Sequence, residues 1–231
     1  MRLNKYLSDI GYCSRRAADK LIEEGRVTVA GQTATLGVKV EDGDVVAVDG
    51  KVVSSEEAKV YIALNKPRGI ECTSNLDVKD NIITYIDYPI RIYPVGRLDK
   101  QSEGLILLMN DGELANNILK ARHFHEKEYI VKVDKPMTDA FLNGMREGVP
   151  ILDTVTRKCP VEEINPYTFR IVLTQGLNRQ IRRMCEYFGY EVKRLKRVRV
   201  LNIEIKDLPL GKWRELTPQE IEKLKQLTLM P

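Results

Sequence analysis

The chain has 231 residues, of which 43% are hydrophobic and 30% charged, with a formal net charge of +4. This composition excludes a disordered or fibrous protein and is ordinary for one or two globular domains with a packed core. The longest apolar runs are strand-sized, far below the roughly 20 residues that a membrane helix requires, and the first residues lack the apolar core of a secretory signal. We therefore expect a cytoplasmic protein without membrane association.

The cysteines and histidines favour neither disulfides nor a metal site. None of the four cysteines forms a C-x-x-C pair, so we expect reduced thiols. His123 and His125 stand two residues apart, which would put both on one face of a strand, but no second cluster completes a ligand set. The sequence predicts no bound metal.

The first fifty residues predict two short helices followed by short strands. Apolar residues recur at helical spacing over 3–10, and Ser14 is a favourable N-cap for a second helix that ends near Gly25. β-Branched stretches at 27–29 and 45–48, separated by turn residues, are typical of strands.

Basic residues gather around these two helices. Arginines on one face can pair bidentately with phosphate oxygens, although charge alone is equally compatible with a solvated helix face. The order R-L-N-K-Y-L-S-D-I-G-Y-C-S-R-R-A-A-D-K-L-I-E-E-G-R-V-T-V-A-G resembles the S4 RNA-binding domain, an αL-type module. The resemblance implies an RNA-facing side lined by Arg2, Lys5, Ser14, Arg15, Arg16 and Arg26.

After residue 59, strands and helices follow one another without strict alternation, which favours an α+β fold with a mixed, largely antiparallel sheet flanked by helices. We expect an S4-like domain over 1–53, a linker over 54–58 and a catalytic domain over 59–231. Strands are predicted at 60–64, 105–109, 129–133, 169–174 and 201–205, and helices at 113–121, 138–147, 180–188 and 218–226.

Three short motifs of the second part carry candidate chemistry. In G-R-L-D-K-Q-S-E-G-L, Asp99 lies in a loop bounded by glycines directly before a buried strand, where a carboxylate is held rigidly yet open to a cleft. In G-L-N-R-Q-I-R-R-M-C, arginines at a helix start are poorly placed for the helix dipole and so indicate a partner anion. In E-K-E-Y-I-V, Tyr129 opens a strand. Taken singly, the aspartate could be a turn residue and the tyrosine a core residue.

In this order, the motifs resemble the RsuA-type branch of the RNA pseudouridine synthases, and the wording is similar to the RluF subgroup. The resemblance implies that Asp99 is the essential carboxylate, that Arg182 pairs with it and that Tyr129 stacks on the target base. Lys66-Pro67-Arg68-Gly69 resembles the first motif of the family, at the floor of the cleft. Substrate contacts are expected from Lys66, Arg97, Arg179 and Arg183 in addition to the basic residues of the first domain.

The implied reaction breaks the N1–C1′ bond of uridine, turns the base and forms a C5–C1′ bond, so we expect no cofactor. The nucleotide must be flipped out at a cost of a few kcal/mol, of which stacking on Tyr129 would recover about 1–3 kcal/mol. An arginine beside Asp99 favours the ionised carboxylate. Whether Asp99 attacks the base, attacks C1′ or removes a proton from C2′ stays open.

The resemblance implies RNA as the partner, first of all 23S large-subunit ribosomal RNA, with a transfer RNA anticodon loop as a second substrate in some members. We expect a monomer. The same chemistry on 16S RNA, and a non-catalytic RNA-binding ribosome-assembly factor, are the alternatives. A hydrolase acting on a small substrate would usually need a second acid or base, and the motifs supply one carboxylate.

Overall fold

The computed structural model of the chain describes residues 1–54, 58–120 and 124–229. Most of the predicted linker, the end of the helix predicted to reach Ala121, and His123 lie outside the described residues. The chain divides into two compact units: the first holds Met1–Val60, Tyr88–Ile92 and Asn110–Gly112, and the second holds Tyr61–Asp87, Tyr93–Met109 and everything from Glu113 onward. In the described part of the chain, no helix has the length and apolarity that crossing a membrane requires.

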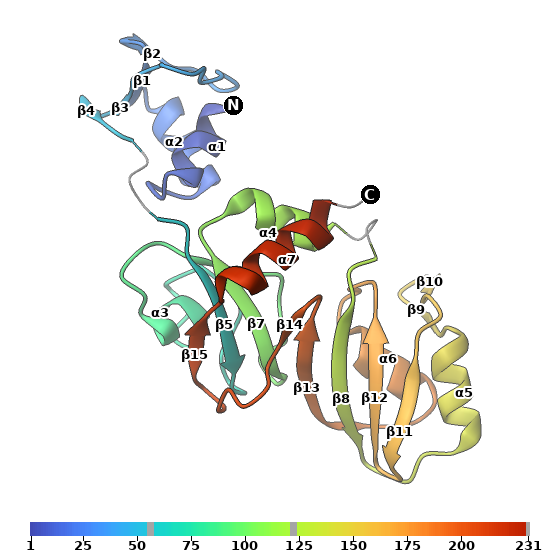
Figure 1. Cartoon of the computed structure of the whole chain (residues 1–231). Helices are drawn as coiled ribbons and strands as arrows, with labels where there is room; N and C mark the ends of the chain where they lie inside the picture. The colour runs from blue at the N-terminus through green and yellow to red at the C-terminus, as the bar shows by residue number, and fades with distance from the viewer. Residues whose placement is uncertain (55–57, 121–123, 230–231) are drawn as a thin grey trace. The chain divides into compact units, whose positions relative to one another are not determined.

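The first unit contains two helices and a small sheet (Figure 1). Ser14 caps the second helix as predicted, because its hydroxyl accepts a hydrogen bond from the Ala17 amide at 3.2 Å. Leu3, Leu7 and Ile22 are buried in the core between the helices and the sheet. The elements are α1 (Leu3–Asp9), α2 (Arg15–Glu23), β1 (Val27–Val29), β2 (Gln32–Thr33), β3 (Val46–Val48) and β4 (Lys51–Val52), with strand order β2-β1-β3-β4.

The second unit is built on one large sheet, whose strands lie side by side in Figure 1. Among the described residues, every strand pairing in this sheet is antiparallel except that of β13 with β7, which confirms the mixed, largely antiparallel prediction. In order, the strands are β11 (Val161–Asn165), β12 (Thr168–Leu173), β8 (Lys127–Val133), β13 (Val192–Val200), β7 (Glu103–Met109), β5 (Tyr61–Lys66) and β15 (Trp213–Glu215); β14 (Ile203–Glu204) pairs with β13 and β6 (Tyr93–Val95) with β7.

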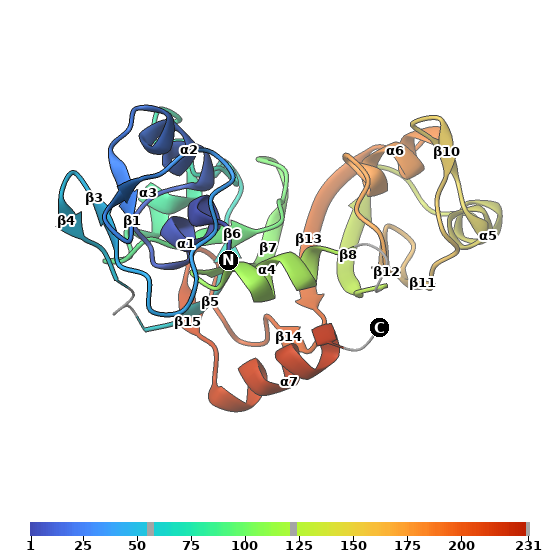
Figure 2. The same cartoon turned by 90° about the horizontal axis from the view of Figure 1, so that it is seen from above.

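Helices cover both faces of this sheet, and Figure 2 shows α6 and α7 on opposite sides of it. On one side, Ile118 of α4 and Leu224 of α7 pack into the apolar cluster that includes Leu107 of β7. On the other side, the Phe141 ring of α5 meets the Phe169 ring edge-on at 5.7 Å. The remaining elements are α3 (Ile82–Ile86), α4 (Gly112–Leu119), α5 (Asp139–Glu147), the hairpin β9 (Pro150–Ile151) and β10 (Thr154–Val155), α6 (Gln180–Tyr187) and α7 (Pro218–Leu229).

Two irregularities in β13 determine where its side chains point. The pairing with β8 shifts register between Val192 and Arg194 and again between Arg197 and Arg199. Arg197 pairs with Tyr129 and Arg199 with Glu128, so the intervening Val198 is an extra residue of a β-bulge. Side chains two positions apart normally share a face of a strand. Here the bulge sends Arg197 to one face of the sheet and Arg199 to the other.

The predicted strand over 201–205 is wrong in its first half. β13 ends at Val200, Leu201 adopts a left-handed conformation with φ of 52°, and only Ile203–Glu204 is extended and paired. The chain therefore turns at a position where the run of apolar residues predicted an extended strand. The arginine-rich stretch before it, in which no strand was predicted, forms the longest strand of the described sheet.

Candidate active site

A cavity of about 710 Å³ opens in the second unit, and its walls bring together residues that are distant in sequence. The loop before β7, the inner faces of β8 and β13, and the loop leading into α6 all contribute. Its lining is strongly cationic, which suits an anionic substrate. The cations are Arg97, Lys100, Lys120, Lys127, Arg179, Arg182 and Arg197, and the carboxylates are Asp99 and Glu71.

Asp99 is held at the cavity wall by its own loop. The Ser102 amide donates to the Asp99 carbonyl at 2.9 Å, and the Gly69 amide donates to the Lys100 carbonyl at 2.8 Å. The neighbouring Leu98 is buried, and its amide donates to Cys72 Sγ at 3.3 Å. The side chain of Asp99 keeps 34% of its surface exposed. The loop is therefore fixed while the carboxylate stays accessible.

Two arginines of the predicted motif approach the Asp99 carboxylate. Arg182 Nε lies 3.8 Å and Arg179 Nη1 lies 3.9 Å from Oδ2 of Asp99. Arg182 is oriented by two further contacts, since its Nη2 donates to Ser102 Oγ at 3.2 Å and its Nη1 to the Val192 carbonyl at 3.4 Å. Burial lowers the pKa of Arg182, and so does the charge of Arg179, whereas Asp99 opposes both effects.

The Arg182 Nε is buried and has no hydrogen-bond partner among the described residues. It faces Asp99 at ion-pair distance, too far for a hydrogen bond. Positive charge therefore lies beside the carboxylate, yet neither arginine forms a hydrogen bond with its oxygens. Such a carboxylate keeps lone pairs for a reacting atom or proton.

Arg179 precedes α6 in a left-handed conformation, with φ of 50° and ψ of 35°, and its side chain does not cap the helix. This conformation costs about 1–2 kcal/mol for a residue with a Cβ. Strained backbone of this kind concentrates at functional sites. Here it coincides with the placement of the guanidinium at the cavity beside Asp99.

Tyr129 lies in β8 with its side chain on the cavity face, and only 9% of its surface is exposed. Its cross-strand neighbours are Ile171 on β12 and Arg197 on β13. The ring is held between two strands, which suits a fixed stacking surface. Its role in stacking stays a prediction.

Lys66 has a different environment from the one expected of a substrate contact. It is fully buried, and its ammonium donates to the carbonyls of Pro67 at 2.9 Å and Ile70 at 2.8 Å. Burial lowers its pKa, while the charges of Cys72, Asp99 and Glu103 raise it. It is not among the lining residues of the cavity. The geometry favours a role in holding the first motif, and a direct contact stays a prediction.

The other predicted arginines of this unit differ in exposure. Arg97 is exposed and lines the cavity mouth. Arg183 donates to the Asn178 carbonyl at 3.0 Å and to its side-chain oxygen at 3.2 Å, so it braces the loop before α6. Arg183 is not part of the lining. The cavity therefore brings Arg97, Arg179 and Arg182 together and leaves Arg183 outside.

Among the described residues of the first unit, the predicted basic side chains do not converge on a common site. Arg2, Arg15 and Arg16 are exposed and make no ion pair with any residue that the structure describes. Lys5 Nζ lies 3.8 Å from Asp9. Arg26 is engaged by two carboxylates, at 2.6 Å from Asp49 and 3.2 Å from Glu24. Their contact with RNA stays a prediction.

Sequence reasoning missed four cations of the cavity wall: Lys100, Lys120, Lys127 and Arg197. Two of them, Lys127 and Arg197, lie next to Tyr129 on the sheet. Burial, and then the charge of Arg197, lower the pKa of Lys127 to about 8. The signal for Lys127 was its position two residues before Tyr129, which places both on one strand face. The position of Arg197 in the cavity could not be predicted, because the bulge breaks the alternation that would show which face of the strand it lies on.

His125 also lines the cavity, and its Nδ1 lies 2.9 Å from the Ile118 carbonyl oxygen, so that nitrogen carries the proton. This contact anchors the start of β8 to the end of α4. In the part of the chain that the structure describes, no three His, Cys, Asp or Glu side chains gather as a metal site would require.

The sequence and the fold match known proteins over nearly the whole length of this chain. The pattern of the family described as RNA pseudouridylate synthase matches residues 60–187, and that of the S4 domain matches residues 1–46. The chain is 55% identical over 229 residues to the "Dual-specificity RNA pseudouridine synthase RluF" of Escherichia coli O157:H7, which covers 98% of this chain and 79% of that protein.

Two further relatives cover nearly the full length of both proteins. The "Ribosomal large subunit pseudouridine synthase B" of Bacillus subtilis is 37% identical over 235 residues, covering 98% of this chain and 96% of that protein. A crystal structure of a pseudouridylate synthase aligns with a TM-score of 0.72 at 28% identity, covering 97% of this chain and 99% of the other.

Proposed function

This chain belongs to the RNA pseudouridylate synthase family, and on that premise we propose that it converts a specific uridine of 23S ribosomal RNA to pseudouridine. The observation that supports the chemistry most directly is the accessible Asp99 carboxylate beside Arg179 and Arg182. An ionised carboxylate is what each conceivable first step needs, whether attack on the base, attack on C1′ or removal of a C2′ proton. The choice among these steps stays open.

The large-subunit substrate is supported by a relative that is named for it and is 37% identical to this chain. A transfer RNA anticodon loop is a second proposed substrate, since the 55% identical relative is named as dual-specificity. We place the enzyme in the cytoplasm as a monomer. Residues 1–53 would dock on RNA, and residues 59–231 would carry out the reaction.

Within the catalytic unit, the proposal assigns separate tasks to the cavity residues. Asp99 reacts, Arg182 pairs with it and Tyr129 stacks on the flipped base. Arg97 and Arg179, which are exposed at the cavity, are suited to the phosphates on either side of that nucleotide.

The test is to incubate the purified protein and its Asp99→Asn variant with unmodified 23S, 16S and transfer RNA. Pseudouridine is then mapped by carbodiimide labelling and primer extension. We expect one new stop in 23S RNA with the wild type. With Asp99→Asn the rate of formation should fall at least about 1,000-fold, because the reacting group is removed. RNA binding by the variant should stay within about twofold, because the isosteric amide leaves the cationic walls in place.

A stop confined to 16S RNA would support pseudouridine formation by this enzyme but would overturn 23S RNA as its substrate. Tight RNA binding without pseudouridine in any of the three RNAs would overturn the enzymatic proposal and favour the ribosome-assembly alternative.

A further inference from the structure

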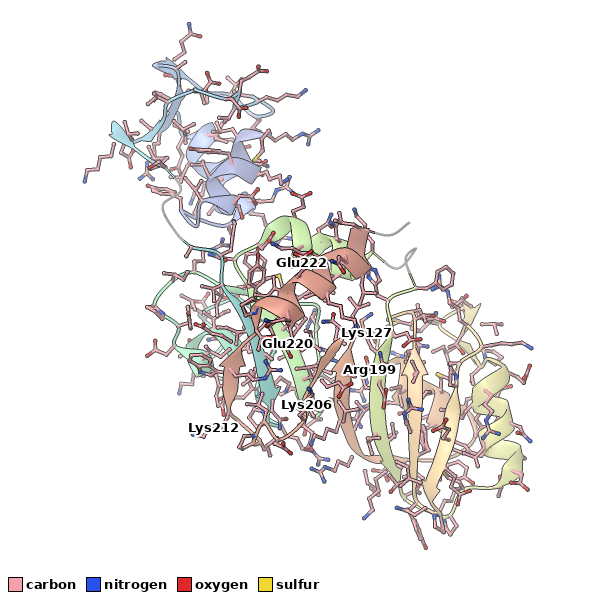
Figure 3. All side chains as sticks on the ribbon, viewed as in Figure 1. Lys127, Arg199, Lys206, Lys212, Glu220 and Glu222 are labelled. Carbon is pink, nitrogen blue, oxygen red and sulfur yellow. The ribbon has the colours of Figure 1, made fainter. Side chains whose placement is uncertain are left out.

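Lys127 and Arg197 flank Tyr129 on the cavity face of the sheet. Lys127 precedes Tyr129 by two residues on β8, and Figure 3 labels it near the start of that strand. Arg197 pairs directly with Tyr129 from β13. Both cations line the cavity. The edge of any base that stacks on Tyr129 would therefore lie next to positive charge from two strands.

Neither cation is neutralised within the described part of the chain. Arg197 is 4% exposed, and its Nε donates to the Leu105 carbonyl at 2.7 Å. Lys127 Nζ reaches only the His125 carbonyl, at 3.4 Å. On the opposite face of the same strands, Arg199 is paired with Glu126 and Glu128. Because an unpaired buried charge is costly, the two cavity cations indicate a ligand that brings negative charge.

Burial separates these two cations from the groups suited to phosphate. Arg179 keeps 45% of its side chain exposed, and Arg97 is exposed as well, as expected for contacts to the RNA backbone. Lys127 and Arg197 lie on the wall beside the aromatic ring instead. At that position a stacked uracil presents its edge, which carries the O2 and O4 carbonyl oxygens.

We propose that Lys127 and Arg197 form an oxyanion site that donates hydrogen bonds to the carbonyl oxygens of the flipped uracil and stabilises negative charge on the base during the reaction. This assignment rests on the proposed function. The uracil is neutral before the reaction and becomes anionic during it, so the two cations bind the transition state more strongly than the ground state.

The charge develops in each of the open mechanisms. If Asp99 attacks C1′, or removes the C2′ proton, the N1–C1′ electron pair leaves on N1 and spreads to O2 and O4. If Asp99 adds to C6 of the base, the electron pair of the C5–C6 double bond becomes an enolate on O4. When the C5–C1′ bond has formed, the bond from Asp99 to C1′ or C6 has broken again, or the C2′ proton has been returned. The proton lost from C5 is balanced by the proton gained on N1. The oxyanion site thus serves whichever step is used.

The surroundings of Lys127 allow its charge to be tested by pH. Its cross-strand neighbours, Leu173 on β12 and Val200 on β13, are apolar. Of the charges in the cavity, that of Arg197 acts on Lys127 and lowers its pKa. The charged and titratable groups that line the same cavity are Glu71, Arg97, Asp99, Lys100, Lys120, His125, Tyr129, Arg179, Arg182 and Arg197. With a pKa of about 8, Lys127 is protonated below that pH and loses its charge above it.

The experiment measures single-turnover rate and RNA affinity for wild type, Lys127→Met and Lys127→Arg on the RNA that the wild type modifies. Removing one oxyanion donor costs about 100-fold in rate, so Lys127→Met should lose about that much while its Kd for RNA changes less than twofold. Lys127→Arg should recover most of the rate. The matched control is Lys132→Met, on the same strand but exposed on the outer face, and its rate should equal that of the wild type.

The pH dependence gives a readout that a structural role would not move. For the wild type, kcat/KM should fall as pH rises through about 8, and Lys127→Arg should shift this fall upward. Full activity of Lys127→Met would overturn the oxyanion site and leave the proposed function intact. A loss of affinity equal to the loss of rate would overturn it in favour of a phosphate contact. Equal defects in the Met and Arg variants would overturn it as well. A wild type that modifies no RNA would overturn both proposals.

Discussion

At the scale of single residues, Gly104 sets how closely β7 approaches β13. Its φ is +110°, and an added Cβ would lie 2.2 Å from the carbonyl oxygen and 2.6 Å from the nitrogen of Arg197. Neither backbone atom can move without shifting a central strand. The parallel pairing beside the cavity, and the position of Arg197 in it, therefore depend on a residue without a side chain.

We expect Gly104→Ala to lower the free energy of unfolding by about 3 kcal/mol, because it adds both steric overlap and an unfavourable backbone angle. Chemical denaturation measures the effect. Gly43→Ala is the control, since Gly43 has a φ of +95° but open space around its Cβ position. Its loss of unfolding free energy, about 1 kcal/mol, therefore measures the cost of the unfavourable backbone angle alone. Equal effects of the two substitutions would mean that the close approach does not matter.

The positions of some residues of the candidate site could be predicted from the sequence, and those of others could not. Asp99 and Arg182 were expected together because each lies in a recognisable motif, and they lie 3.8 Å apart. The burial of Lys66 could not be predicted, because only the folded loop supplies the two carbonyls that satisfy its ammonium.

At the scale of elements, β8 is held to its neighbours by ion pairs on the outer face of the sheet. Glu128 accepts hydrogen bonds from Arg170 on β12 at 2.7 Å and from Arg199 on β13 at 2.9 Å. The bond from Arg170, followed by that from Arg199, lowers the pKa of Glu128 below its ordinary value of 4.5. A carboxyl with a lowered folded-state pKa stabilises the fold above its unfolded-state pKa, and this contribution is lost as pH falls through the folded-state value.

We therefore expect Glu128→Gln to reduce the free energy of unfolding at pH 7 by about 1–2 kcal/mol, because two charge-assisted bonds at a half-buried site are weakened. Thermal unfolding across pH measures it, and the difference from wild type should shrink below pH 4.5. Glu162→Gln removes a carboxylate on the same Arg170 that is 65% exposed, and it should cost less than about 0.5 kcal/mol. A pH-independent Glu128→Gln effect would exclude the ion pairs as its cause.

The four longer helices of the second unit, α4 to α7, could be predicted well, because apolar residues recur at helical spacing over each of them. The five-residue α3 (Ile82–Ile86) was not predicted, since it is too short to show that spacing. α5 and α6 begin and end within a residue of the expected bounds. β13 was missed for a physical reason. Its two bulges interrupt the alternation by which a strand is detected, and they place its arginines on both faces of the sheet.

At the scale of the whole molecule, the net charge of +4 understates the positive surface. Seven cations against two carboxylates line the cavity, and further exposed arginines lie in the first unit. Affinity for RNA should therefore depend steeply on salt.

Each phosphate contact contributes about 0.7–0.9 to the slope of log affinity against log salt. If Arg15 and Arg16 both contact phosphate, replacing both by alanine should reduce the slope by about 1.4–1.8. Arg26→Ala should change it least, because Arg26 is already held by Asp49 and Glu24. Filter binding of RNA at salt concentrations of about 50 to 300 mM, a range that includes physiological ionic strength, measures the slope for the double variant and for Arg26→Ala. An unchanged slope for the double variant would remove these arginines from the interface.

The bulge at Val198 allows β13 to present arginines on both faces of the sheet. Because of it, Arg197 lies in the cavity and Arg199 pairs with Glu126 and Glu128 on the reverse of the sheet. In a regular strand, two arginines two positions apart would lie on the same side of the sheet, and either the cavity wall or the ion pairs with Glu126 and Glu128 would lack a cation. The bulge at Val198 therefore decides which side of the sheet carries each positive charge, and the spacing of the two arginines in the sequence does not reveal this.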